Sequence, residues 1–444
     1  MPLCNRYPFA HVAVLQDCIR YGKTYRGQPS KQNSALTLSL SIYSRNPLQK
    51  IGQNAYVMQA RGSSKSENKT NTAASVDDDL EREVYGVLGV PIDNIDITTA
   101  LGKIRTAAAK RRPFLISTAN LNFLATSQVD AEFRTSLLQS ELCTADGMPI
   151  VWIARLLGIP VRERVAGSDI FEELKLSRDP NSELKVFLFG GAEGVAESAC
   201  KNLNSRSGGL TCVGSLSPGF ASVEEMSVDS IFDHINSSGA DFLAAALGAK
   251  KGQTWLLRNH DRIKTPVRVH LGATVNFQAG TVQRAPTRVR KLGLEWLWRI
   301  KEEPHLWRRY WGDGLVFLRL LLTRVVPLMV IAGWASLKRD KKSQGLNIEK
   351  TEDDKTVILS LNGAAVASNI GNITPSLQAA VAVPKDIVIN FSNTSHIDAR
   401  FLGLLSMLNK QLGKRRLKLT CARVPRRVER IFRLSGFQFL LGQS

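Results

Sequence analysis

The sequence predicts an α/β protein: a Rossmann-like parallel sheet with helices on both faces, then a basic helical tail and a small second α/β domain. Three observations lead to this fold class. Short apolar segments alternate with amphipathic segments of helical length from about residue 84. A stretch rich in tryptophan and arginine follows, and a polar linker then separates a second alternating pattern. A length of 444 residues favours two or three domains.

Five segments of the first domain are predicted to be strands, and each leads into a turn of glycine or other small residues. They are residues 113–118, 184–190, 210–216, 240–247 and 266–272. The ligand crevice of an open α/β sheet lies beyond the carboxyl ends of its strands. One rim should therefore be lined by the residues that end or follow these strands: Thr118, Gly190, Gly248 and Gly272.

The first 80 residues are rich in Ser, Asn, Gln and basic side chains and lack sustained apolar periodicity. This composition predicts a mostly disordered leader. An organelle transit peptide and an over-extended start of translation stay open as alternatives. The remaining boundaries are expected at 81–283 for the first domain, 284–340 for the tail, 341–355 for the linker and 356–444 for the second domain.

The charge of the chain points to a polyanionic partner. Lys and Arg number 59 against 39 Asp and Glu, which gives a net charge of +20. An anionic membrane surface, diphosphates and nucleic acid all fit this charge, but no nucleic-acid reader motif accompanies it, so nucleic acid is not expected. The six cysteines form no CxxC pair or His/Cys cluster. They indicate neither a zinc site nor a disulfide framework and favour a reducing compartment.

The tail ends in the apolar stretch 315–337. It is long enough to span a bilayer, but Arg319 and Arg324 would be costly at the bilayer centre, and Pro327 predicts a bend. We therefore expect a monotopic or re-entrant helix at an anionic membrane surface. A spanning helix and a soluble core helix stay open.

The second domain is predicted to hold three strands, at residues 356–363, 385–393 and 417–423, and three helices, at residues 372–381, 399–414 and 428–437.

Several sequence blocks match one family in order. They include ISTANLNFL, LCTADGMPIVWIARLLGIPVRERVAGSDI and the stretch from Ala240 to Tyr310. From about Val84 to Trp311, the chain resembles the WecG/TagA/CpsF glycosyltransferase family. The resemblance implies transfer of a sugar from a UDP-sugar, with inversion, to a polyprenyl-diphosphate-linked glycan of the cell surface or an exopolysaccharide. It places the enzyme at the cytoplasmic face of the inner membrane and leaves a homo-oligomer open.

The second domain resembles a STAS domain around HIDARFLGLL. Regulatory STAS domains carry a phosphorylatable Ser or Thr directly after the aspartate, whereas Ala399 and Arg400 follow Asp398 here. Phosphoswitching at this position is therefore not expected, and a protein partner of the domain stays open.

Asp146, in the block TADGMP, is the candidate catalytic base. Sugar transfer with inversion needs a base for the acceptor hydroxyl and positive charge for the departing diphosphate. The resemblance assigns the first role to this aspartate. The competing structural interpretation is a common Asp-Gly turn.

Residues at the strand ends are expected to bind the donor. The resemblance aligns Thr118 and Asn120 with the T-x-N motif of the family, although capping of the next helix would also explain them. Gly190 and Gly191 open a helix after a strand, where backbone N–H groups suit phosphates. The chain lacks GxGxxG and Walker patterns at this turn.

The chain departs from its family after Gly248. The family pattern LGxPKQExW becomes LGAKKGQTW, so Gly252 and Gln253 replace its Gln and Glu, and Asn276 stands where an Asp is common. We expect Gln253 and Asn276 to bind the donor still, with altered recognition of the sugar. The changes resemble the branch that adds glucose or another neutral sugar, and loss of activity is the other possibility.

Arginines of the tail are the candidate ligands of the acceptor diphosphate, because guanidinium groups bind phosphate in a bidentate manner. The resemblance favours Arg284, Arg299 and Arg309. The alternative is that these arginines only form a solvated basic face of the helix and bind no ligand. The DxD spacing in Asp77–Asp79 is interpreted as a solvated acidic run, so neither a metal nor a cofactor is expected. A noncatalytic membrane-associated scaffold or regulator is the alternative function.

Overall fold

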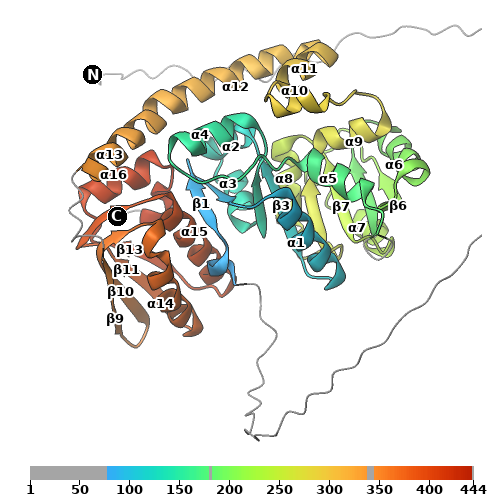
Figure 1. Cartoon of the computed structure of the whole chain (residues 1–444). Coiled ribbons are helices and arrows are strands. Elements are labelled where there is room, and N and C mark those ends of the chain that lie inside the picture. Colours follow the sequence, from blue (N-terminus) through green and yellow to red (C-terminus); the bar gives the residue numbers. More distant parts are fainter. Residues whose placement is uncertain (1–77, 180–182, 338–344, 443–444) are drawn as a thin grey trace, which may run out of the picture. The chain divides into compact units, whose positions relative to one another are not determined.

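The computed structural model describes residues 78–179, 183–337 and 345–442 (Figure 1). The first folded region is a six-stranded parallel sheet with strand order β4-β3-β8-β7-β5-β6. Its strands are β3 (Phe114–Ala119), β4 (Leu142–Ala145), β5 (Leu184–Gly190), β6 (Leu210–Leu216), β7 (Phe242–Ala246) and β8 (Val267–His270). The predicted fold class is confirmed, and all five predicted strands are present.

Helices cover both faces of this sheet (Figure 1). They are α1 (Ile97–Ala109), α2 (Leu121–Val129), α3 (Ala131–Gln139), α4 (Met148–Leu156), α5 (Gly167–Leu176), α6 (Val195–Arg206), α7 (Asp229–Ser237), α8 (Ala249–Arg258) and α9 (Gly272–Ala279). Successive side chains of a strand point to opposite faces. Accordingly, Leu188 joins the core that contains α1, α5 and α6, whereas Phe187 and Phe189 join the core that contains α7 and α8.

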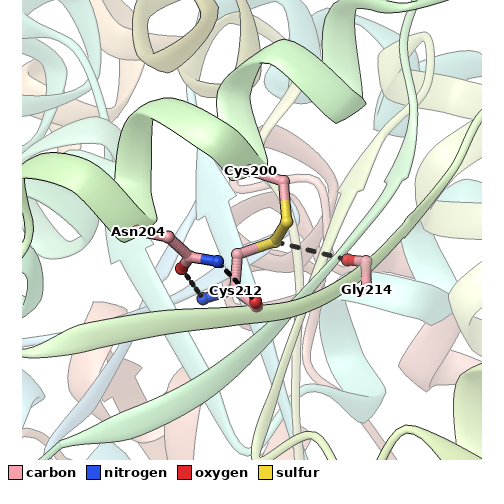
Figure 2. Close-up of a disulfide and its surroundings, with 4 residues drawn as sticks. All are labelled: Cys200, Asn204, Cys212 and Gly214. Atoms are coloured by element: carbon pink, nitrogen blue, oxygen red, sulfur yellow. Dashed lines mark hydrogen bonds between the residues drawn. A yellow bond between two sulfur atoms is a disulfide. The ribbon is translucent and has the colours of Figure 1, made fainter.

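A disulfide joins α6 to β6 (Figure 2). Cys200 and Cys212 have their Cα atoms 5.3 Å apart. The side-chain amide of Asn204 makes two hydrogen bonds to the backbone of the same strand. It donates to the carbonyl of Cys212 at 3.0 Å and accepts from the N–H of Cys212 at 2.8 Å. The expectation that the cysteines form no disulfide framework therefore missed this one bridge. The pair comes together because the chain reverses between α6 and β6, which the spacing of the cysteines does not reveal.

Ordered structure begins earlier than expected. A short 3-10 turn, η1 (Asp79–Glu81), precedes a hairpin of β1 (Val84–Val87) and β2 (Val90–Asp93). Asp79 is 6% exposed and pairs with Arg82 at 2.8 Å. The interpretation of this aspartate as part of a solvated run was wrong, because it balances buried cations. The predicted leader up to residue 77 lies outside the described residues.

The tail forms α10 (Thr287–Lys291), α11 (Glu295–Glu302) and then a long helix of three labelled parts: α12 (Trp307–Leu320), the π-helical turn η4 (Leu321–Val325) and α13 (Val326–Leu337). Pro327 lies just after η4, so a local π turn accommodates the proline and the helix continues. The segment Pro304–Trp334 is long and apolar enough to cross a membrane, and 11% of its most apolar window is buried.

The long helix has two different faces. Leu320 and Val325 are buried in the core that includes α2 and α4. The exposed apolar side chains recur every three or four residues and form what we call the apolar stripe: Trp307, Trp311, Leu315, Leu318, Leu322, Val326, Met329, Val330 and Trp334. This spacing places them along one side of the helix.

The C-terminal domain contains a mixed sheet of order β12-β10-β11-β13, with β9 pairing antiparallel to β10. Its elements are β9 (Leu346–Glu352), β10 (Thr356–Ala365), α14 (Ile370–Ala382), β11 (Asp386–Asn390), β12 (Thr394–Ile397), α15 (Ala399–Lys414), β13 (Leu419–Ala422) and α16 (Arg426–Leu434). The three predicted strands and three predicted helices are confirmed. Strand β9 lies within the segment expected to be linker, whose residues 341–344 are outside the described part of the chain.

Helix α15 packs against β1. Arg400 donates to the carbonyl of Val84 at 3.0 Å, and a Cβ atom added to Gly403 would lie 2.1 Å from that same carbonyl oxygen. The side chain of Lys410 is fully buried and pairs with Asp79 and Glu141, at 3.1 Å in each case. The C-terminal domain is therefore joined to the N-terminal region by close backbone contact and a buried ion cluster.

Candidate functional site

The carboxyl ends of β3 and β4 bring the first candidate residues together. These strands pair in parallel with Ala119 opposite Ala145, and the N–H of Asp146 donates to the carbonyl of Ala119 at 2.7 Å. Asp146 therefore begins the turn after β4 beside the end of β3, where Thr118 and Asn120 lie. The strand-end rim expected from the sequence thus contains these three residues.

The carboxyl group of Asp146 is partly buried, and its Oδ2 accepts from the N–H of Gly167 at 3.3 Å. Burial raises the pKa of Asp146 to about 7. The positive charge of Arg164 opposes this rise, whereas the negative charges of Glu295 and Asp169 add to it. A carboxyl group with a pKa near neutrality can accept and release a proton at physiological pH.

Arg164, Asp169 and Glu295 were missed by the sequence analysis. The Arg164 guanidinium pairs with Asp169 at 2.7 Å and with Glu295 at 2.9 Å. It therefore links the first turn of α5 to the first turn of α11 beside Asp146. Arg164 and Asp169 both lie in the string RERVAGSD. Glu295 lies 131 residues after Arg164, and no sequence pattern indicates that the two side chains pair.

Asp169 also holds two arginines of the tail. Arg284 donates to it and to the hydroxyl of Ser168, the latter at 2.9 Å, and Arg290 pairs with it at 2.6 Å. One carboxylate thus accepts from three guanidinium groups, those of Arg164, Arg284 and Arg290. In this structure the tail is fastened beside Asp146.

The other two predicted arginines lie further along the tail. Arg299 pairs with Glu303, and its guanidinium lies 5.4 Å from the ring centroid of Phe277 on α9. Arg309 is less restrained, because its side chain is 53% exposed and lies 3.8 Å from Asp313. Together with burial, the charge of Arg309 lowers the pKa of His270. The positive charge of Arg309 thus acts on the end of β8.

Structural roles account for part of the predicted donor set. The Oδ1 atom of Asn120 caps α2 by accepting from the N–H of Phe123 at 3.1 Å. Thr118 is 5% exposed and packs against Gly167. The side-chain oxygen of Asn120 thus has a local partner, while the residue itself remains beside Asp146.

Gly190 and Gly191 have positive φ angles of 99° and 85°, a region that favours glycine. The N–H of Gly191 donates to the carbonyl oxygen of Ala246 at 2.8 Å. A Cβ atom added to Gly190 would lie 2.7 Å from this carbonyl oxygen. The turn therefore needs glycine to pass close to β7, and it leads through Gly194 into α6. This contact does not depend on a bound phosphate.

Gln253 is fully buried on α8 and donates to the hydroxyl of Ser117 at 2.9 Å. Side chains of Ser117 and Thr118 point to opposite faces of β3, so the amide of Gln253 lies on the other side of the sheet from Thr118. Gly248 caps α8, and Asn276 is partly buried on α9. The structure thus separates Gln253 from Thr118 while leaving Gly248 at the strand-end rim.

The unusual glycine at position 252 is explained by His270. A Cβ atom on Gly252 would lie 2.3 Å from Cδ2 of this histidine, whose Nε2 contacts the carbonyl of Leu247. The imidazole thus occupies the space that a side chain at position 252 would need. The departure from the family pattern is matched by a bulky neighbour on β8.

We expect Gly252→Ala to destabilise the protein by about 1–3 kcal/mol, because overpacking of a filled site costs this much. Gly102→Ala on α1 is the matched control: a Cβ atom there would meet no described atom within 4 Å. In an open helical position, replacing glycine with alanine stabilises by up to about 1 kcal/mol. Urea denaturation should give opposite signs for the two variants, and equal signs would contradict this account of the glycine.

Comparison with known proteins identifies the family of this chain. The chain matches the family described as "Glycosyl transferase WecG/TagA/CpsF family" over residues 85–328, more than half of its length, and the STAS domain over residues 347–443. It is 25% identical to the N-acetylglucosaminyldiphosphoundecaprenol N-acetyl-beta-D-mannosaminyltransferase of Bacillus spizizenii over 225 residues, covering 49% of this chain and 85% of the relative. The enzyme of the same name from Staphylococcus aureus is 26% identical over 218 residues, covering 48% and 82%. The chain therefore belongs to the WecG/TagA/CpsF family of glycosyltransferases, with a STAS domain at its C-terminal end.

Proposed function

We propose that this enzyme transfers a sugar from a UDP-sugar to a polyprenyl-diphosphate-linked glycan with inversion at the anomeric carbon. An acceptor hydroxyl oxygen forms a bond to that carbon while the bond from the carbon to the β-phosphate oxygen breaks. UDP leaves with the bonding electron pair, and the hydroxyl proton passes to Asp146. A single carboxylate is enough for this displacement.

The observation that carries the proposal is the environment of Asp146. Its carboxyl group lies at the carboxyl end of β4, and its pKa is raised to about 7. A base with such a pKa is ionised in a large fraction of molecules at neutral pH and still binds a proton well.

Arginines beside Asp146 and along the tail provide positive charge for the diphosphate groups. The charge of Arg164 acts on Asp146, although Arg164 also pairs with Asp169 and Glu295, and Arg309 of the tail has an exposed guanidinium. We propose that these two arginines stabilise the departing diphosphate, because guanidinium groups bind phosphate oxygens in pairs. Arg284 and Arg299, which like Arg164 are paired with carboxylates in this structure, remain candidates for the acceptor diphosphate.

The names of the relatives support the choice of acceptor. Both describe transfer of N-acetylmannosamine to N-acetylglucosamine linked through diphosphate to undecaprenol. We propose the same acceptor class for this chain and a UDP-hexose or UDP-N-acetylhexosamine as donor. Thr118, Asn120, Gly190, Gly191, Gly248 and Asn276 are proposed to surround the donor, while Gln253 has a role in packing.

A lipid-linked acceptor needs an enzyme at the membrane. The apolar stripe of the long helix is the proposed contact, because exposed tryptophans and aliphatic side chains along one helix face favour the membrane interface. We propose that the helix lies in the cytoplasmic leaflet of the inner membrane without spanning it, since the opposite face packs on the protein.

Turnover with defined substrates tests the proposed function. Purified protein is incubated with each of a panel of UDP-sugars and a short-chain polyprenyl-diphosphate N-acetylglucosamine acceptor. We expect UDP release to depend on the acceptor and one donor to dominate. Donor binding without any transfer across the panel would favour the noncatalytic scaffold instead.

We expect kcat/KM to rise about tenfold per pH unit below pH 7 and to level off above it, because only ionised Asp146 accepts the proton. Glu295→Gln should shift this rising limb to lower pH, since the charge of Glu295 raises the pKa of Asp146. Initial rates at low acceptor concentration measure both profiles. If kcat/KM rises over the same pH range in the wild type and in Glu295→Gln, a group other than Asp146 controls the pH dependence.

A further inference from the structure

The face of the STAS domain that follows Asp398 is occupied within this chain. Asp398 caps α15 by accepting from the N–H of Phe401 at 3.0 Å. Arg400 is 8% exposed and donates to the carbonyl of Val84, and Lys410 is fully buried against η1 and the segment before β4. This face of α15 therefore packs on the chain's own N-terminal region.

A different face of the domain is open and strongly basic. Helix α16 turns Val428, Ile431 and Phe432 into the core of the domain. Its exposed side carries the arginine face, which we define as Arg426, Arg427, Arg430 and Arg433. The only acidic residue in the sequence of α16, Glu429, pairs with Arg433. The arginine face therefore keeps a large excess of positive charge.

Space for phosphate groups lies next to the arginine face. Arg423, which is exposed at the end of β13, and Arg433 line a cavity of about 660 Å³ together with Glu429 and Gln438. Guanidinium groups suit phosphate oxygens because they donate two parallel hydrogen bonds.

The arginine face adjoins the helix that carries the apolar stripe. Helix α16 contacts both η4 and α13, and the labelled helices α13 and α16 lie next to each other in Figure 1. Leu328 and Ile331 of the long helix pack against the core of the STAS domain. Val326, Met329 and Val330 of the stripe are exposed within the same turns of the long helix. A basic surface and an apolar surface thus belong to two helices in direct contact.

We propose that the arginine face of α16 binds the phosphate headgroups of anionic phospholipids, so that the STAS domain is a second membrane-docking element of this enzyme. The inference rests on the proposed membrane contact of the apolar stripe. Tryptophans and aliphatic side chains enter the interface, while arginines beside them attract anionic lipid. The docking would fix the orientation of the transferase domain through the packing of α15.

A membrane fits these observations better than a polynucleotide or an acidic protein. All three are polyanions, but a lipid bilayer also offers an apolar interior next to its phosphates, so it can cover the apolar stripe and the arginine face together. A soluble acidic partner would leave the adjoining tryptophans and leucines of the stripe in water.

Vesicle sedimentation of the full-length protein tests the proposal. The vesicles contain phosphatidylcholine alone or phosphatidylcholine with phosphatidylglycerol, at low and at physiological salt. One variant carries Arg426→Gln, Arg427→Gln and Arg430→Gln. The matched control carries Lys103→Gln, Lys110→Gln and Arg206→Gln, which are exposed on α1 and α6 and remove the same three charges.

We expect the α16 variant to bind anionic vesicles at least about tenfold more weakly than the wild type. Its binding to phosphatidylcholine and its turnover of a short-chain acceptor in detergent should be unchanged. The control variant should bind anionic vesicles nearly as the wild type does. Wild-type affinity of the α16 variant, or an equal loss in both variants, would overturn the proposal in favour of a soluble partner or of net charge alone.

A third variant separates this inference from the proposed function. Leu315→Ser, Leu318→Ser and Leu322→Ser together interrupt the apolar stripe at exposed positions. Loss of binding to phosphatidylcholine in this variant supports the membrane contact of the stripe. If this variant binds as the wild type does, the stripe is not the contact, and the comparison of the α16 variant with its control still decides the role of the arginines.

Discussion

Asp146→Asn is expected to lower kcat by about 10²–10⁴-fold, because the substitution removes the base that accepts the hydroxyl proton. The amide has nearly the same volume as the carboxyl group, and its Oδ1 can still accept from the N–H of Gly167. The geometry of the turn after β4 should therefore survive. Initial rates of acceptor-dependent UDP release measure the effect.

The stability of the same variant should not fall. The folded-state pKa of Asp146 is raised to about 7, well above the usual value for an aspartate, so its ionised form is disfavoured in the folded protein. The cost of this ionisation is absent at low pH and grows as the pH rises from about 4 to 7. Above neutral pH, an uncharged asparagine should leave the melting temperature equal to that of the wild type or higher.

Asp241→Asn provides the control at the opposite end of the sheet. Asp241 precedes β7, accepts from the N–H of Lys185 at 3.1 Å and pairs with Arg111 at 3.0 Å. Its loss should change kcat by less than about twofold, since the pair is at the surface. Retention of wild-type turnover by Asp146→Asn would refute the assignment of the base, and an equal fall in both variants would indicate a general effect of lost charge.

The fold class followed from the sequence because the buried strands have strong local patterns. LKVFLFG is a long apolar run and LTCVGSL a mostly apolar one, each followed by a turn of small residues, and both form strands over their full length, as β5 and β6. Strand β4 was missed because LCTA is only four residues long. Strand β9, LNIEKTE, is mostly polar, and only its pairing with β10 makes it a strand.

The site was accessible to sequence reasoning only in part. Asp146 was identified because an ordered set of blocks resembles a family, while its own local signal was a common turn. The partners that set its pKa could not be found in this way. Arg164 contacts Glu295 only because the tail packs beside α5 in the folded protein. Asp169 accepts from three arginines that lie far apart in the sequence, Arg164, Arg284 and Arg290.

The contact between the domains was also invisible in the sequence. Lysine is a residue that normally stays in water, and Lys410 lies in the ordinary helical sequence MLNKQLGK. The structure buries it completely. Burial lowers the pKa of Lys410, an effect that Glu141 and Asp79 oppose with their negative charges. Such a lysine can be recognised only when the three-dimensional position of its partners is known.

Lys410→Met is expected to destabilise the protein by about 3–5 kcal/mol, because it removes the fully buried cation of the ion cluster and leaves Glu141 with the more distant, half-exposed Lys414 alone. Lys410 also donates to the carbonyl of Ser140 at 3.0 Å, just before β4. The lysine therefore supports the start of the strand whose other end leads to Asp146. The variant should lose cooperativity between the domains as well as stability, which urea denaturation followed by fluorescence and by activity can measure.

Lys414→Met distinguishes burial from charge, because Lys414 contacts the same two carboxylates, Asp79 at 3.4 Å and Glu141 at 3.6 Å. Its side chain is 52% exposed, whereas that of Lys410 is fully buried. Water and salt screen the exposed pair, so its loss should cost less than about 1 kcal/mol. Equal losses in the two variants would mean that the burial of Lys410 adds nothing to the stability beyond the positive charge that both lysines bring to the cluster.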